Sequence, residues 1–193
     1  MNYHVLPENA VRQFIDSSTV FEELARARQQ ALPYRGGMYW KRQGDYEYLV
    51  KTTADNQQQR LGRRTQASEA IYTAFQQHKQ AAEARVKSLQ ASLQEAERMN
   101  RALKVGRMPS LVIELLNAIA SAGLNQHFVV VGTYALYAYE AAAGVRIVPG
   151  ALATQDVDLL WDARKRVKFF INMERLNTSM LGILQSVVPS FER

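Results

Sequence analysis

The chain has 193 residues, of which 47% are hydrophobic and 22% charged, and these ordinary globular values exclude a wholly disordered protein. It has no cysteine, which excludes a disulfide scaffold and a thiolate zinc site. The net charge of +6 suits a polyanionic partner such as RNA, DNA or a nucleotide, but a mildly basic soluble protein without such a partner explains it equally well.

From the sequence we expect neither a secretory signal nor a histidine motif for a metal. The first residues lack the basic and apolar regions of a secretory signal. The apolar stretch 128–145 has the length of a membrane helix, but Glu140 and two glycines within it favour a strand, a turn and a helix instead. We therefore expect a cytoplasmic protein without a membrane partner, and we assign no role to His4, His78 or His127.

The N-terminal region, 1–66, is predicted to contain helices, a β-hairpin and a basic loop. Apolar residues recur at helical spacing from Val5 to Leu32, either as one helix or as two that divide at Ser17-Ser18-Thr19. Two alternating aromatic runs flank Gln43-Gly44-Asp45, which is typical of a hairpin. The polar segment 52–66 is predicted to be a loop whose arginines either reach a polyanion or are solvated.

The hairpin interleaves aromatic residues with cations, which can stack bases and hold phosphates or can cover a neighbouring helix. Because a two-stranded hairpin needs packing to be stable, the second explanation is favoured. The residues concerned are Tyr39, Lys41, Tyr46, Tyr48 and Lys51.

One long amphipathic helix is predicted within 67–106. From Ala67 to Lys104 there is neither proline nor glycine, and apolar positions recur every three or four residues, close to a heptad seam. The seam should pair either with the N-terminal helix or with the same helix of a second copy, so a coiled-coil homodimer is one of two alternatives.

The remaining region, 107–193, alternates helices with short apolar strands. The predicted segments are a helix at 109–123, a strand at 128–131, a tight turn at Gly132-Thr133, a helix to Glu140, a loop or short irregular strand at 144–153, a strand at 154–161, and helices at 162–175 and 179–188.

Two acids on the second of these strands form a candidate metal site. Asp156 and Asp158 project from one face of the strand, whereas Val157 and Leu159 enter the core from the other. Neighbouring carboxylates repel each other unless a cation lies between them, and Mg²⁺ prefers such oxygen ligands together with substrate phosphates. The pair is therefore predicted to bind a metal.

The Gly-Thr turn supplies a candidate phosphate site. Gly132 lets the backbone turn sharply and approach a ligand, and Thr133 stands where a helix begins, with unpaired N–H groups that attract phosphate. Turn and metal together predict a bound nucleoside triphosphate. In the helix that Asp162 caps, Arg164 and Lys165 are further candidates for phosphate binding, and a solvated helix face is the alternative for them.

The pattern apolar-Gly-Thr, a spacer, then Asp-apolar-Asp-apolar resembles the DNA polymerase beta-like nucleotidyltransferase superfamily. The wider runs from Val131 to Glu140 and from Thr154 to Asp162 are similar to those of a poorly characterised bacterial branch of nucleotidyltransferase-fold proteins. The spacer between Gly132 and Asp156 is longer than the one common in the superfamily, and a long loop at this place is normal in that branch.

The resemblance implies transfer of a nucleoside monophosphate from an NTP to an acceptor hydroxyl, with release of pyrophosphate. Two Mg²⁺ ions held by Asp156 and Asp158 would assist in-line attack on the α-phosphate, and the Gly132-Thr133 turn would grip the β- and γ-phosphates. The superfamily usually has a third carboxylate on a later strand, but no strand-like segment follows Trp161. Because Glu174 and Glu192 lack such a context, we expect a fragment or a naturally short member with weak or absent activity.

The predicted fold class is α+β, with a helical N-terminal region, a β-hairpin and one long helix, followed by a partial nucleotidyltransferase α/β core. The leading function is nucleotidyl transfer to an unknown acceptor, either RNA or protein. One alternative is a non-catalytic nucleotide- or nucleic-acid-binding scaffold that assembles through the long helix. The other is a nucleotidyltransferase toxin acting on tRNA.

Overall fold

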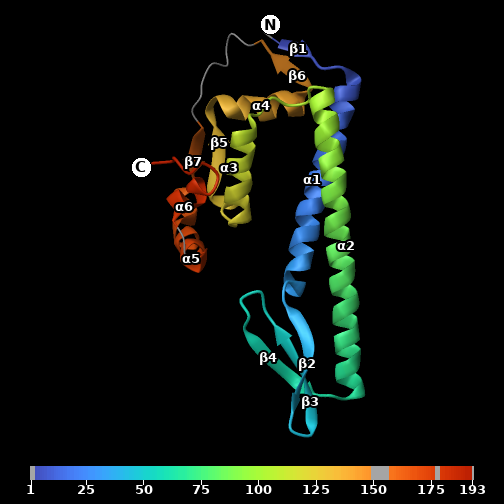
Figure 1. Cartoon of the computed structure of the whole chain (residues 1–193). Helices are drawn as coiled ribbons and strands as arrows, with labels where there is room; N and C mark the ends of the chain where they lie inside the picture. The colour runs from blue at the N-terminus through green and yellow to red at the C-terminus, as the bar shows by residue number, and fades with distance from the viewer. Residues whose placement is uncertain (1–2, 149–156, 177–178, 193) are drawn as a thin grey trace. The chain divides into compact units, whose positions relative to one another are not determined.

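The structure, a computed structural model, describes residues 3–148, 157–176 and 179–192 (Figure 1). Helices alternate with small antiparallel sheets, so the predicted α+β class is confirmed. None of the described helices is both long and apolar enough to cross a membrane.

The chain divides into two compact units, which are described separately. Unit 1 consists of residues 1–11 and 103–193, and unit 2 consists of residues 12–102. Helix α1 (Glu8–Ala31) begins in unit 1 and continues through unit 2.

Two long antiparallel helices, α1 and α2 (Gln66–Ala102), run side by side in unit 2 (Figure 1). Near the start of this stretch of α1, the Gln13 side-chain amide donates to the backbone oxygen of Ala96 at 3.2 Å. Further along, Arg85 of α2 pairs with Glu23 at 2.8 Å. The long helix is thus confirmed, and α1 of the same chain is a partner of its seam.

Helix α1 is continuous, so the alternative of a division at Ser17-Ser18-Thr19 is wrong. The Ser17 hydroxyl donates to the Phe14 carbonyl at 3.1 Å, and the Thr19 hydroxyl donates to the Ile15 carbonyl at 2.9 Å. Both hydroxyls are bonded to carbonyls of the preceding helical turn, so neither is available to cap a new helix.

A three-stranded antiparallel sheet follows α1 and the short 3-10 helix η1 (Leu32–Tyr34) in unit 2. Strands β2 (Gly37–Gln43) and β3 (Tyr46–Thr52) form the predicted hairpin, and Gly44 adopts φ +61° in its turn. Strand β4 (Gln58–Arg63) pairs with β3, so the prediction of a loop over the whole of 52–66 is wrong. The sequence does not reveal β4, because both faces of a polar edge strand can be exposed and such a strand lacks the hydrophobic alternation that predicts a strand.

One face of this sheet packs on α2. Met38 and Leu49 of the sheet are buried together with Phe75 of α2. Three partly buried aromatic side chains surround them: Tyr34, Trp40 and Tyr72. α2 thus covers one face of the sheet.

Unit 1 contains two small two-stranded sheets and several short helices. The elements of this unit other than the start of α1 are β1 (Tyr3–Val5), α3 (Ser110–Ser121), η2 (Asn125–His127), β5 (Phe128–Val131), α4 (Gly132–Ala143), β6 (Val145–Ile147), β7 (Asp158–Trp161), η4 (Ala163–Lys165), α5 (Arg166–Leu176) and α6 (Met180–Gln185). One sheet pairs β1 with β6 and the other pairs β5 with β7, both antiparallel.

The core of unit 1 lies between α3, α6 and the β5–β7 sheet. Its buried residues are Leu115, Ile119, Leu124 and Ile183. Val157 and Leu159 pack against this cluster, as the alternation along the second strand predicts. The predicted strand begins at 154, but residues 149–156 lie outside the described part of the chain.

Candidate functional site

The candidate site is built where β5 ends and α4 begins. In the β5–β7 ladder Val131 lies opposite Asp158. Gly132, the next residue, opens α4 with φ +67°, a left-handed conformation that favours glycine. A Cβ atom added to Gly132 would overlap the Asp158 Oδ2 atom and lie 3.2 Å from its Cγ. The Asp158 carboxylate therefore lies directly over the Gly132 turn.

The start of α4 has the electrostatic character of an anion site. The N–H groups of a first helical turn have no partner inside the helix and carry partial positive charge. Val131, at the N-cap position, makes no side-chain hydrogen bond to them. Half-buried Thr133 is in this first turn, and Asp158 is exposed beside it. An exposed carboxylate and a helix N-terminus thus face the same place.

Arg164 and Lys165 lie at the other end of the β5–β7 sheet. The Asp162 backbone N–H donates to the His127 carbonyl at 2.9 Å, just beyond the last residue of β7. Arg164 donates from Nε and Nη2 to the two Asp162 carboxylate oxygens at 2.9 and 3.1 Å. Lys165 donates to the Gln126 carbonyl at 2.7 Å. Asp158 is the first residue of the four-residue strand β7, and Arg164 and Lys165 follow its last residue. Because four residues of extended chain span about 13 Å, β7 separates these cations from Asp158.

Asp162 is the predicted cap of this segment, and it accepts a hydrogen bond from the Arg164 backbone N–H at 3.2 Å. Its pKa lies well below the ordinary aspartate value, chiefly because the Arg164 side chain donates to the carboxylate. The two cations thus already have a carboxylate partner.

The structure therefore brings together three of the predicted site residues, Gly132, Thr133 and Asp158. Asp156, the other predicted metal ligand, lies outside the described residues.

Comparison with known protein families finds one similarity in this region. A family model described as nucleotidyltransferase matches residues 110–193, a little under half of the chain. This region is similar to the nucleotidyltransferase family. The match begins at the first residue of α3 and includes the Gly132 turn and both aspartates. No curated protein and no solved structure matches the chain.

A third carboxylate near the turn is not found within the described part of the nucleotidyltransferase region. Glu174 is exposed on helix α5, and Glu192 is exposed near the end of the described residues. No described strand follows Trp161. Likewise, the described residues contain no group of three acids or histidines that could hold a metal ion.

A buried ion pair on α4 was not foreseen from the sequence. Glu140 is 5% exposed and accepts from both Nε and Nη2 of Arg107, the Nε bond measuring 3.1 Å. Arg107 also donates to the Ile147 carbonyl at 3.0 Å. The pair ties the segment before α3 to α4 and β6. The only local signal was an acid inside an otherwise apolar helix.

His127 is a second buried polar residue of the nucleotidyltransferase region. It is fully buried, and Phe169 packs edge-on against its ring. Among the described residues its Nδ1 atom has no hydrogen-bond partner. Burial lowers the pKa of His127, and the charges of Lys165 and Lys168 lower it further, whereas Asp162 raises it. The His127 ring is thus packed among the side chains of the nucleotidyltransferase region.

Proposed function

We propose that the nucleotidyltransferase region binds an NTP with Mg²⁺ and transfers its nucleoside monophosphate to an acceptor hydroxyl. The family assignment supports the reaction class. The observation that supports the site is the contact between Gly132 and Asp158, where a Cβ atom would displace the carboxylate. The chain thus keeps an acid directly against the positive end of α4.

The residues present fit Mg²⁺. Carboxylate oxygens are its preferred protein ligands, and the missing Cβ at Gly132 leaves room for the Asp158 carboxylate. We assign Asp158 and Asp156, two positions apart in the sequence, as the ligands. Bound Mg²⁺, with two ions expected, would offset the charge on the attacking and leaving oxygens.

The chain's own part in the reaction is to hold the triphosphate. The first-turn N–H groups at Gly132 and Thr133 would bind the β- and γ-phosphates, as helix N-termini commonly do. This holds the α-phosphate near Asp158, within reach of an acceptor. Arg164 and Lys165 are left out of this site, because both are engaged at the far end of the sheet.

The test is transfer of label from an NTP that carries it on the α-phosphate. The chain is incubated with Mg²⁺ and either RNA or protein acceptors, and labelled acceptor and pyrophosphate are measured. We expect Asp158→Asn to abolish both products and Arg164→Ala to keep them. Pyrophosphate release that survives Asp158→Asn would contradict the proposal.

The same assay separates the alternatives. No transfer in this assay, together with nucleotide binding measured by calorimetry, is the result expected of a binding or scaffolding protein. Label confined to tRNA is the result expected of a tRNA-modifying toxin.

A further inference from the structure

The three-stranded sheet of unit 2 has a second face, opposite the one that packs on α2. Met38, Trp40 and Leu49 point toward α2. Because strand side chains alternate, the residues between them point the other way. The register places these residues on that second face: Tyr39, Lys41, Gln43, Tyr46, Tyr48, Val50, Thr52, Gln58, Arg60 and Arg63. We call this the Tyr face.

A β-bulge places two arginines on the Tyr face. Arg60 pairs with Val50 and Gly62 pairs with Leu49, which leaves Leu61 as the extra residue. Positions 60 and 63 would point to opposite faces of a regular strand, since they are an odd number of residues apart. The bulge, with Gly62 at φ +145°, brings both arginines to the same side.

Each of these arginines stacks on a tyrosine. The guanidinium carbon of Arg60 lies 3.2 Å from the centre of the Tyr48 ring, and that of Arg63 lies 4.2 Å from the centre of the Tyr46 ring. A stacked guanidinium is held flat and presents its outer surface to solvent. Such planes, like aromatic rings, are surfaces on which nucleic-acid bases stack.

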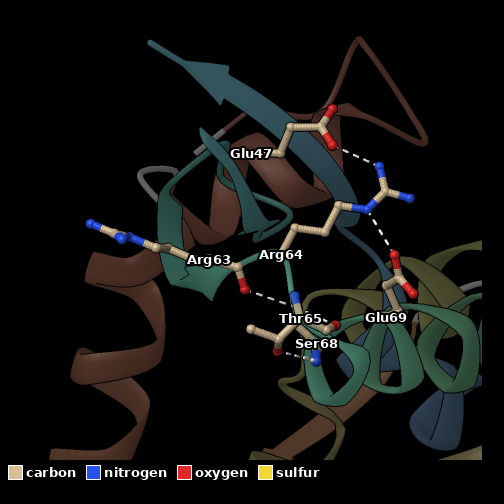
Figure 2. Close-up of polar contacts among 6 residues, drawn as sticks. All are labelled: Glu47, Arg63, Arg64, Thr65, Ser68 and Glu69. Atoms are coloured by element: carbon tan, nitrogen blue, oxygen red, sulfur yellow. Dashed lines mark hydrogen bonds and ion pairs between the residues drawn. The ribbon is translucent and has the colours of Figure 1, made fainter. Parts of the chain in front are cut away.

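The positive charge of the Tyr face is not neutralised. Within the described part of the chain, Lys41, Arg60 and Arg63 form no ion pair, and no Asp or Glu occupies a Tyr-face position of the three strands. Arg64, the next residue, is different: it pairs with Glu47 at 2.6 Å and with Glu69 at 2.8 Å. Figure 2 shows the Arg63 side chain extending away from this network.

The Tyr face is also hollowed at its centre. A cavity of about 360 Å³ opens there, within the size range of small-ligand pockets. Its lining combines polar, aromatic and charged side chains: Lys41, Gln43, Tyr48, Val50, Gln58 and Arg60. The cavity can hold one nucleic-acid base, and Lys41 and Arg60 in its lining can contact the phosphates next to that base.

We propose that the Tyr face binds single-stranded nucleic acid. Stacking planes, unpaired cations and amide groups on one exposed sheet are the features by which proteins hold single strands. A duplex presents its phosphates but buries the faces of its bases, so it would leave the stacking planes unused. An acidic protein would pair with the cations of the Tyr face but would leave its cavity unfilled. The proposal is independent of the reaction assigned to the nucleotidyltransferase region.

The test measures binding of the whole chain to fluorescent oligouridylate and oligothymidylate of about twelve nucleotides, by fluorescence anisotropy. With three cations at the backbone, the logarithm of the affinity should fall with the logarithm of salt with a slope of about −2. Replacing Arg60 and Arg63 together by Ala should weaken binding about tenfold or more, because one stacked base alone contributes at least about fivefold. Tighter binding of RNA or of DNA identifies the natural source of the strand.

Three comparisons make the test specific. Arg60→Lys keeps the charge and removes the flat plane, so it should restore the salt slope but not the affinity. Lys41→Ala should weaken binding, whereas Arg42→Ala should not, since the neighbouring Arg42 points to the other face of β2. An abasic oligonucleotide of equal length should bind at least about fivefold more weakly. Circular dichroism checks that each variant is folded.

The proposal is overturned if neither oligonucleotide binds, or if the abasic strand or a duplex binds as tightly as the single strand. It is also overturned if Arg42→Ala weakens binding as much as Lys41→Ala. A face used by an acidic protein or by a second copy of the chain would give one of these results.

Discussion

Replacing Gly132 by Ala tests whether the turn and Asp158 form one site. Gly132 has φ +67°, and a non-glycine residue in this region costs about 1–2 kcal/mol. The added Cβ would also overlap Oδ2 of Asp158 and lie 3.2 Å from its Cγ, so the carboxylate must swing away from the start of α4. We expect both a loss of stability and a loss of Mg²⁺-dependent NTP binding.

Gly123→Ala separates the two effects. Gly123 has φ +72°, and no atom lies within 4 Å of the place that a Cβ would occupy, so it carries the same backbone cost without any collision. Thermal unfolding should show similar destabilisation of the two variants. Calorimetric titration with Mg²⁺ and ATP should show unchanged affinity for Gly123→Ala and about 10- to 100-fold weaker affinity for Gly132→Ala, the loss typical when metal ligands lose their orientation. Equal affinities of the two variants would show that the Gly132 turn and Asp158 do not form one site.

Three further predictions concern stability. Glu140→Ala should lower the free energy of unfolding by about 3–5 kcal/mol, measured with denaturant, because it leaves the partly buried Arg107 charge unpaired; a loss below about 1 kcal/mol would contradict this. Leu49 is fully buried, so Leu49→Ala should lower the free energy of unfolding, measured with denaturant, by about 2–5 kcal/mol. Leu61 is exposed at the bulge, so Leu61→Ala should change it by no more than about 0.5 kcal/mol. Equal losses in the two variants would show that the sheet core is misassigned. Because the pKa of His127 is lowered on folding, the unfolded chain binds more protons below about pH 6.5, so stability should fall there by up to about 1.4 kcal/mol per pH unit. His127→Gln should remove the part of this fall that His127 contributes, and an unchanged pH profile would contradict the assignment.

The parts of the fold that the sequence predicts are those with strong local signals. The long helix follows from more than thirty residues without glycine or proline, and α2 spans Gln66–Ala102. The strand, turn and helix around Gly132 follow from a β-branched run, a glycine and an alanine-rich segment. In each case neighbouring residues alone determine the element.

The parts that it does not predict depend on partners far along the chain. β4 is polar, and it becomes a strand because β3 offers a free edge and tyrosines on which its arginines stack. Glu140 and Arg107 are 33 residues apart, and no spacing rule connects them. Arg164 and Lys165 follow β7 closely, yet the antiparallel ladder carries them to the end opposite Asp158. Sequence proximity to a motif is therefore a poor guide to a place in its site.

The most direct test of the central claim is calorimetric titration of NTP, with and without Mg²⁺, into the chain and into the double variant Asp156→Ala with Asp158→Ala. We expect Mg²⁺-dependent binding by the unaltered chain and its loss in the double variant. Equal binding by both proteins, or binding by neither, would contradict it.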